Sequence, residues 1–290
     1  MKLALPSIRH DQEGFAALIG VAERTEACEF ADVEIDMAHV GWFDADMCAT
    51  FGAILYRLGR RLNDVHLLNI RSDVEVILSR NGFLSSYGRA QLPDRYGTTI
   101  PYQRFDVRDD RHFADYVERE FVCRPNMPKM SEGLLKKFRE SVFEIFSNAV
   151  IHSQTKLGIF SCGQYFHKQH RIVFSVADLG VGIRENVRLH AGLDLAADAA
   201  IVWAGAARNT TKRGRVPGGL GLKLLREFIT LNRGRIQIVS DRGYWHLSHG
   251  QVGTALFPHC FPGTVVSIEI NAADTQSYRL NSEISETDVF

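Results

Sequence analysis

The stretch SVFEIFSNAVIHS, residues 141–153, predicts an amphipathic helix with a polar stripe that can carry chemistry. Its apolar residues recur at three- and four-residue steps, as they do on the buried face of a helix. Glu144, Asn148 and His152 stand at i, i+4 and i+8, so their side chains line one stripe. A carboxylate and a carboxamide one turn apart can activate water and hold a hard cation such as Mg²⁺. A solvated polar stripe would have the same pattern, so the rest of the chain has to decide between the two interpretations.

The composition is that of an ordinary globular protein with no bulk charge bias. Of the 290 residues, 45% are hydrophobic and 23% are charged, which supplies enough apolar material for a large core. Lysine and arginine total 34, as do aspartate and glutamate, so nucleic-acid binding is not indicated. The five cysteines lack CxxC spacing, which favours reduced thiols. Because no signal peptide or membrane-length apolar run occurs, we expect a cytoplasmic protein with no membrane contact.

Residues 1–92 predict a small α/β module, because strand and helix patterns alternate there. The pattern predicts a strand at 32–37, a helix at 47–62, a buried strand at 65–70 and a helix at 73–80. Asp44 or Asp46 is the predicted cap of the first helix. Residues 93–130 contain four prolines and predict a connector with one helix at 112–120.

Glycine motifs follow the polar helix in a regular order. A strand at 171–177 ends in Asp178, and Gly180 and Gly182 come next, so a carboxylate lies beside backbone that a ligand can approach closely. Gly218-Gly219-Leu220-Gly221 opens a helix at 223–231, where exposed N–H groups suit phosphate. Gly263-Thr264 leads into a strand at 265–270, and residues 272–290 predict a frayed polar tail.

Other nucleotide and metal motifs are not matched. Glu185 stands where a Rossmann motif needs its third glycine, and no GxxxxGK[ST] sequence occurs. A metal site is conceivable in the predicted hairpin region, although the spacing fits no standard zinc pattern. Its candidate ligands are His246, His249, His259 and Cys260.

Taken in order, the polar helix and the three glycine motifs resemble the N, G1, G2 and G3 boxes of the GHKL ATPase superfamily. That superfamily includes gyrase, Hsp90, MutL and the histidine kinases. The resemblance covers residues 131–271 and implies an α/β sandwich of helices on a mixed sheet, the Bergerat fold, that binds ATP and Mg²⁺. Glutamate at 144 is typical of the hydrolysing members and of the serine-kinase anti-sigma factors, whereas histidine kinases usually carry asparagine there.

The resemblance also implies a role for each matching residue. Glu144 would activate the attacking oxygen, and Asn148 would hold Mg²⁺. Asp178 would accept a hydrogen bond from the adenine amino group, with Thr264 as an indirect adenine contact. Gly180 and Gly182 would line the base and sugar. The phosphates would lie against Gly218, Gly219, Leu220 and Gly221, under a lid in which Thr211 and Lys212 are candidate contacts.

Residues 30–90 resemble a STAS domain, the fold of anti-sigma-factor antagonists. The matching parts are the strand before Trp42, the loop Phe43-Asp44-Ala45-Asp46 and the following helix. The family carries a phosphorylatable serine in that loop, whereas Ala45, Asp46 and Met47 follow Asp44 here. Phosphorylation of this loop is therefore not expected. A generic α/β module used for contacts is an equal alternative.

These resemblances imply a slow ATPase switch that relays its nucleotide state to a protein partner through the N-terminal module. A homodimer is possible. Two alternatives stay open at this point. The chain could be a serine/threonine protein kinase of the anti-sigma type acting on a separate STAS-like partner. It could also be a non-catalytic adaptor in which ATP only stabilises an interface.

Overall fold

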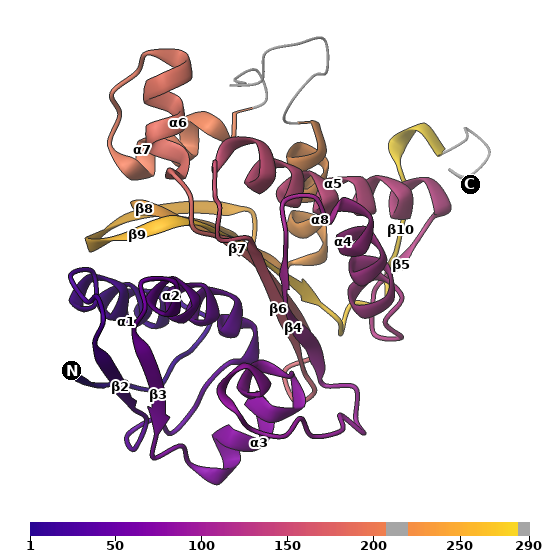
Figure 1. The fold of residues 1–290 in the computed structure, drawn as a ribbon. Helices are drawn as coiled ribbons and strands as arrows, with labels where there is room; N and C mark the ends of the chain where they lie inside the picture. Colours follow the sequence, from indigo (N-terminus) through magenta and orange to yellow (C-terminus); the bar gives the residue numbers. More distant parts are fainter. Residues whose placement is uncertain (207–219, 284–290) are drawn as a thin grey trace.

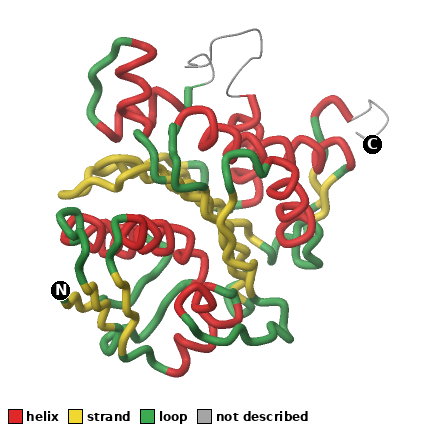
Figure 2. Tube along the Cα trace, in the orientation of Figure 1, coloured by secondary structure: helices red, strands yellow, loops and turns green. Residues whose placement is uncertain are grey.

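The computed structural model describes residues 1–206 and 220–283, which form a mixed α/β fold in four layers (Figure 1). A three-stranded parallel sheet forms the first layer, and two helices, α1 and α2, separate it from a five-stranded antiparallel sheet. The remaining long helices cover the opposite face of the large sheet, so that helices lie on both sides of its strands (Figure 2). The fold class is therefore mixed α/β, as predicted.

The N-terminal layers correspond to the alternating strands and helices of the sequence pattern. The parallel strands are β1 (Lys2–Ala4), β2 (Asp32–Asp36) and β3 (Asp64–Leu68). The helices are α1 (Gln12–Arg24), α2 (Cys48–Arg60) and α3 (Ser72–Arg80), followed by the short helix η2 (Phe83–Tyr87). Residues 48–55 of helix α2 are buried without a break, because the helix lies between two sheets (Figure 1).

Two predictions for these layers are wrong in detail. Strand β3 is only half-buried, because it is an edge strand of the small sheet. Neither Asp44 nor Asp46 caps α2: a 3-10 turn, η1 (Ala45–Met47), precedes the helix, and no side chain caps either element. Both carboxylates instead point into a buried interface with the large sheet.

The large sheet has the strand order β4-β6-β7-β9-β8 and antiparallel pairing throughout, so the expectation of a mixed sheet is wrong. Its strands are β4 (Thr99–Phe105), β6 (Ile159–Phe166), β7 (Arg171–Asp178), β8 (Arg235–Ser248) and β9 (Gln251–Asn271). Strand β4 was not predicted, since Pro101 interrupts its pattern. The edge position and the register irregularity between Ile100 and Gln103 accommodate this proline.

Helices α5 and α8 lie on one face of the large sheet, and shorter helices flank them. Ser131 caps the N-terminus of α5 by accepting a hydrogen bond from the Leu134 N–H group. The helices on this side are α4 (Asp110–Tyr116), its π-helical continuation η3 (Val117–Val122), α5 (Glu132–His152), α6 (Gly182–Ala191), α7 (Ala197–Ala204) and α8 (Leu220–Asn232).

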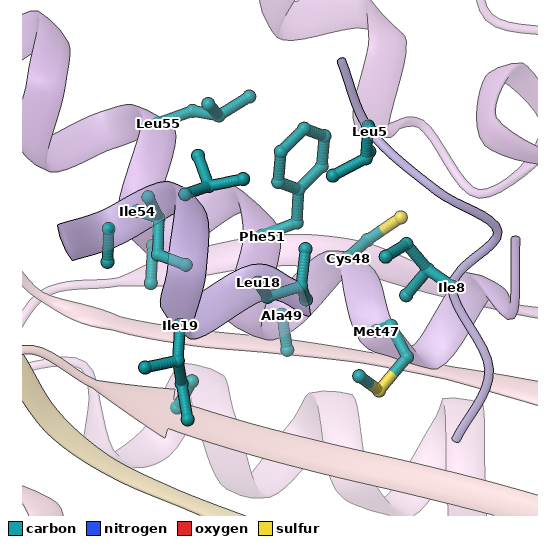
Figure 3. Close-up of a cluster of buried hydrophobic side chains, with 14 of the residues drawn as sticks. Leu5, Ile8, Leu18, Ile19, Met47, Cys48, Ala49, Phe51, Ile54 and Leu55 are labelled. Atoms are coloured by element: carbon teal, nitrogen blue, oxygen red, sulfur yellow. The ribbon is translucent and has the colours of Figure 1, made fainter. Parts of the chain in front are cut away.

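Each face of the large sheet has its own hydrophobic core, because successive strand residues point to opposite faces. On β7, Ala177 belongs to the core shared with α1 and α2, whereas Val176 belongs to the core under α5 and α8. Figure 3 shows part of the first core, to which Leu18 and Ile19 of α1 and Phe51 of α2 all belong. The N-terminal layers therefore complete the burial of the large sheet.

The C-terminal segment is not a frayed tail over its described residues. Strand β10 (Ser277–Tyr278) pairs in parallel with β5 (Lys129–Met130), and the turn η4 (Asn281–Glu283) follows. The Glu283 carboxylate accepts hydrogen bonds from the Ser131 hydroxyl and the Gly133 N–H group at the start of α5. Sequence pattern alone could not predict this docking, because it depends on a partner far away in the chain.

Among the described residues, no helix combines the length and the apolar composition that crossing a bilayer requires.

Candidate functional site: a cavity beside the buried carboxylate Asp178

A cavity of about 180 Å³ lies between α5, α6, α7, the start of α8 and the strand pair β7–β9. Five of the predicted site residues line it, although they come from four separate segments of the chain. They are Glu144, Asn148, Asp178, Gly182 and Thr264. Most of the remaining wall is apolar, and includes Ile145, Ala149, Val176, Ile183, Val187, Ile201, Trp203, Leu222, Ile238 and Val266.

Asp178 is the polar centre of this apolar wall. It ends β7 and is only 4% exposed. The backbone N–H groups of Gly180 and Thr264 donate to the carboxylate, while its Oδ1 atom has no partner within the described part of the chain. Burial raises the pKa of Asp178 to about 8, because these two hydrogen bonds only partly offset desolvation. A buried acceptor without a partner is costly, so the site favours a ligand that donates a hydrogen bond there.

Two glycines let the backbone close around Asp178. A Cβ atom on Gly263 would lie 2.0 Å from the Asp178 carbonyl oxygen, and one on Gly180 would lie 2.1 Å from the Ser153 carbonyl oxygen. Gly180 therefore brings the loop after β7 against the end of α5, where the Val181 N–H group donates to Ser153. Gly180 is not among the residues lining the cavity, so its expected contact with the base and sugar has no support.

Gly182 lines the cavity in a left-handed conformation, with φ of 76°. Ser240 of β8, which the sequence did not single out, fixes this turn. Its hydroxyl accepts from the Ile183 N–H group at 2.8 Å and donates to the Gly263 carbonyl at 3.0 Å. The hydroxyl of Thr264 lies 3.0 Å from that of Ser240. One buried hydroxyl thus joins the start of α6 to the strand pair that carries Asp178.

Asn186, which lines the cavity, is a second residue that the sequence analysis missed. Its amide nitrogen donates to the His152 carbonyl at 2.7 Å and to the Gly182 carbonyl at 3.0 Å. Its Oδ1 atom is buried and has no partner among the described residues. The sequence did contain a signal for this residue. Asn186 follows the helical spacing of Ile183 and Val187, so it is a polar residue on the face of α6 that was expected to be buried.

The polar stripe of α5 faces this same cavity. Glu144, Asn148 and His152 all line it, together with the apolar Ile145 and Ala149. The stripe is therefore not simply a solvated helix face. A carboxylate and a carboxamide one helical turn apart lie across the cavity wall from the buried acid Asp178.

The glycine-rich segment is only partly described. Thr211, Lys212, Gly218 and Gly219, predicted as phosphate contacts, lie outside the described residues. Leu220 and Gly221 are the first two residues of α8, three positions before the helix start that the sequence predicted. Leu222, the next residue, lines the cavity.

The candidate metal ligands of the hairpin do not come together. His259 lies 3.7 Å from the Glu23 carboxylate, and the described residues contain no cluster of three potential metal ligands. The described part of the chain therefore gives no support to a metal site in this region.

Comparison of the chain with protein-family models and with curated proteins finds no match. The chemistry of the site therefore has to be argued from its geometry. That geometry combines an apolar cavity, an unpartnered buried acceptor, and a glutamate–asparagine pair on one helix.

Proposed function

We propose that this chain is an Mg-ATP-binding protein of the GHKL type, with an N-terminal module resembling a STAS domain. In this proposal it is a slow ATPase that relays its nucleotide state to a protein partner. The observation that carries the proposal is the meeting of Glu144, Asn148 and Asp178 in one cavity. The predicted motifs that supply them lie up to 34 residues apart, and nothing in a generic α/β fold requires them to converge.

The apolar part of the cavity suits a flat heteroaromatic base. Ile183, Ile201 and Trp203 supply apolar and aromatic surface, and the unpartnered Asp178 oxygen supplies a single buried acceptor. An exocyclic amino group such as that of adenine would donate to this oxygen. Guanine presents a carbonyl oxygen at the corresponding position, so the ionised Asp178 carboxylate would disfavour GTP.

The polar part of the cavity suits a metal-bound phosphate chain. Asn148 would hold Mg²⁺, which neutralises phosphate charge when it is bound. Glu144, one turn away, would accept the proton of an attacking water. A general base of this kind contributes roughly 10²- to 10⁴-fold to a rate.

The buried loop of the N-terminal module limits the alternatives. Phe43, Asp44, Ala45 and Asp46 are all buried against the large sheet. The loop therefore has neither a hydroxyl nor an exposed surface for phosphotransfer. A kinase role would act on a separate substrate protein, and it stays the alternative to the ATPase.

Equilibrium binding tests the nucleotide part of the proposal. Trp203 lines the cavity, so its fluorescence should change when Mg-ATP binds and should change less with Mg-GTP. A Trp203→Phe variant identifies the signal, because Trp42 and Trp245 are the only other tryptophans in the sequence. We expect Asn148→Ala and Asp178→Asn to weaken Mg-ATP binding about tenfold or more. Unchanged affinity in both variants would refute the site.

Single-turnover hydrolysis tests the catalytic part. We expect Glu144→Ala to slow hydrolysis by roughly 100-fold or more while Mg-ATP still binds. Glu140→Ala is the matched control, because Glu140 lies one turn earlier on α5 and is exposed beside Lys137. Binding without any turnover in the wild type would instead favour the adaptor function.

A further inference from the structure

A second polar cluster lies on the face of the large sheet opposite the cavity, where the N-terminal layers dock. His10 and Asp46 form a fully buried pair through the His10 Nδ1 atom and the Asp46 Oδ2 atom. The His10 Nε2 and Asp46 Oδ1 atoms have no partner within the described ranges. Nothing in the proposed nucleotide chemistry uses these residues.

The surroundings of this pair are strongly charged for a buried interface. Asp44 accepts hydrogen bonds from the backbone N–H group of His10 at 2.7 Å and from the indole N–H group of Trp42 at 2.6 Å. From the sheet, Arg171 of β7 faces Asp44 at 3.9 Å and binds Glu269 of β9 at 2.8 Å.

Protonation of His10 decides the charge balance of this cluster. Three carboxylates, those of Asp44, Asp46 and Glu269, act on the imidazole, and Arg171 is the cation that pairs with two of them. The neighbouring Asp11 turns its carboxylate to the Gly14 N–H group, and α1 places the Phe15 ring 5.9 Å from the imidazole. Burial opposes the charged imidazole, but attraction to Asp46 and the hydrogen bond with it outweigh burial and raise the pKa of His10.

The cluster is connected to the strands that carry the cavity residues. The Ser175 hydroxyl of β7 lies 3.4 Å from Asp46 and 2.8 Å from the Ser267 hydroxyl of β9. Ser175 and Ser267 are register partners, and so are Asp178 and Thr264, three residues further along the same strand pair. Three residues along a strand span only about 10 Å. The interface thus holds the same two strands whose far face forms the cavity.

We propose that the His10–Asp46 pair, when His10 is protonated, holds the N-terminal layers against the large sheet and thereby raises the nucleotide affinity of the cavity on the other face of this sheet. We call this protonated pair the latch. The latch itself is independent of the proposed function, and only its effect on nucleotide affinity rests on that function. Below pH 6.5 His10 is charged and the latch is closed. As the pH rises through the folded-state pKa of His10, the proton is lost and the docking contribution is lost with it. Asp46 then stays buried without a cation, which is the costly state of a broken buried pair.

Two measurements on the full chain without nucleotide test the latch. Imidazole NMR should show His10 titrating above pH 6.5. Hydrogen exchange should show protection factors for residues 5–10 and 40–47 that fall by roughly tenfold or more between pH 6 and pH 9. In His10→Gln the protection should be low at both pH values. His66→Gln, which changes an exposed histidine of β3, should behave as the wild type.

Each outcome decides the proposal. A His10 titration at or below pH 6.5, or equal protection at both pH values, would overturn the latch even if His10→Gln fails to fold. Mg-ATP affinity tests the coupling: at pH 6 we expect His10→Gln to bind several-fold more weakly than the wild type, and at pH 9 equally. Equal affinity at pH 6 overturns the coupling alone. If the wild type binds no nucleotide, the proposed function fails, while the latch is still judged by the first two measurements.

Discussion

The burial of the Asp178 carboxyl group destabilises the folded chain. Its pKa is about 8 in the folded state against 3.8 in the unfolded state. Between these values the folded chain binds more protons than the unfolded chain, so the free energy of unfolding falls as the pH rises. The buried carboxylate therefore costs folding stability at neutral pH.

Replacing this acid should stabilise the protein at neutral and alkaline pH. We expect Asp178→Asn to raise the free energy of unfolding at pH 8 by about 2–5 kcal/mol relative to the wild type, with little change near pH 4. Urea unfolding between pH 4 and pH 8 measures this difference. Asp115→Asn, at an exposed aspartate, serves as the control. A wild type and a variant with parallel pH profiles would show that Asp178 is not the titrating group.

The glycines around Asp178 should tolerate no side chain. A Cβ atom on Gly263 would overlap backbone atoms of Asp178 and Leu179, and neither can move aside easily. We expect Gly263→Ala to lower the free energy of unfolding by about 2–4 kcal/mol in thermal or urea unfolding. Gly59→Ala is the matched control, because open space surrounds this glycine in α2, and it should be neutral or stabilising. A tolerated Gly263→Ala would mean that the strands separate readily here.

At the scale of elements, the first turn of α5 depends on a residue from the far end of the described chain. Ser131 caps this turn, and Glu283 accepts hydrogen bonds from Ser131, Gly133 and Leu280. These bonds, the Ser131 hydroxyl first, lower the pKa of Glu283. The stability that the Glu283 carboxylate adds to the first turn of α5 is therefore present above the unfolded-state pKa of Glu283. This stability is lost as the pH falls through the folded-state pKa.

The expected consequence is local fraying of α5. In Glu283→Ala we expect faster amide exchange at Gly133 and Leu134, with no change at the cavity end of the helix. At acidic pH, where Glu283 is protonated, the difference in amide exchange between variant and wild type should disappear. Glu227→Ala removes an exposed glutamate from α8 and should leave α5 unchanged. Equal exchange in the variant and the wild type at neutral pH would show that Ser131 alone caps the helix.

At the scale of the whole molecule, the two cores share one sheet, so they should unfold together. Phe51 of α2 is fully buried in the first core. We expect Phe51→Ala to lower the free energy of unfolding by about 3–5 kcal/mol. We expect Trp42, in the N-terminal layers, and Trp245, in the second core, to report the same transition when each is left as the single tryptophan, with and without Phe51→Ala. Two separated transitions would contradict a single cooperative unit.

Local patterns predicted the elements of this molecule better than their assembly. The spacing of Val142, Ile145 and Phe146 was enough to predict α5, and the apolar run before Asp178 was enough to predict β7. The stacking of α1 and α2 on the large sheet was not predicted, although the apolar run of β7, interrupted only by Ser175, suits a strand buried on both faces. Ser240, Asn186 and the His10–Asp46 pair act through partners that are distant in sequence, and single-sequence periodicity carries no information about such partners.

The pairing of β10 with β5 has a consequence for the order of folding. Ser131 and Glu283 are 152 residues apart in the chain. During synthesis the first turn of the cavity helix therefore has only its Ser131 cap, without the Glu283 contacts, until the ribosome has passed residue 283. Contacts that close so long a loop form late, after local helices and hairpins. We expect the nascent chain to form α5 early and to complete the anchoring of this helix as one of its last steps.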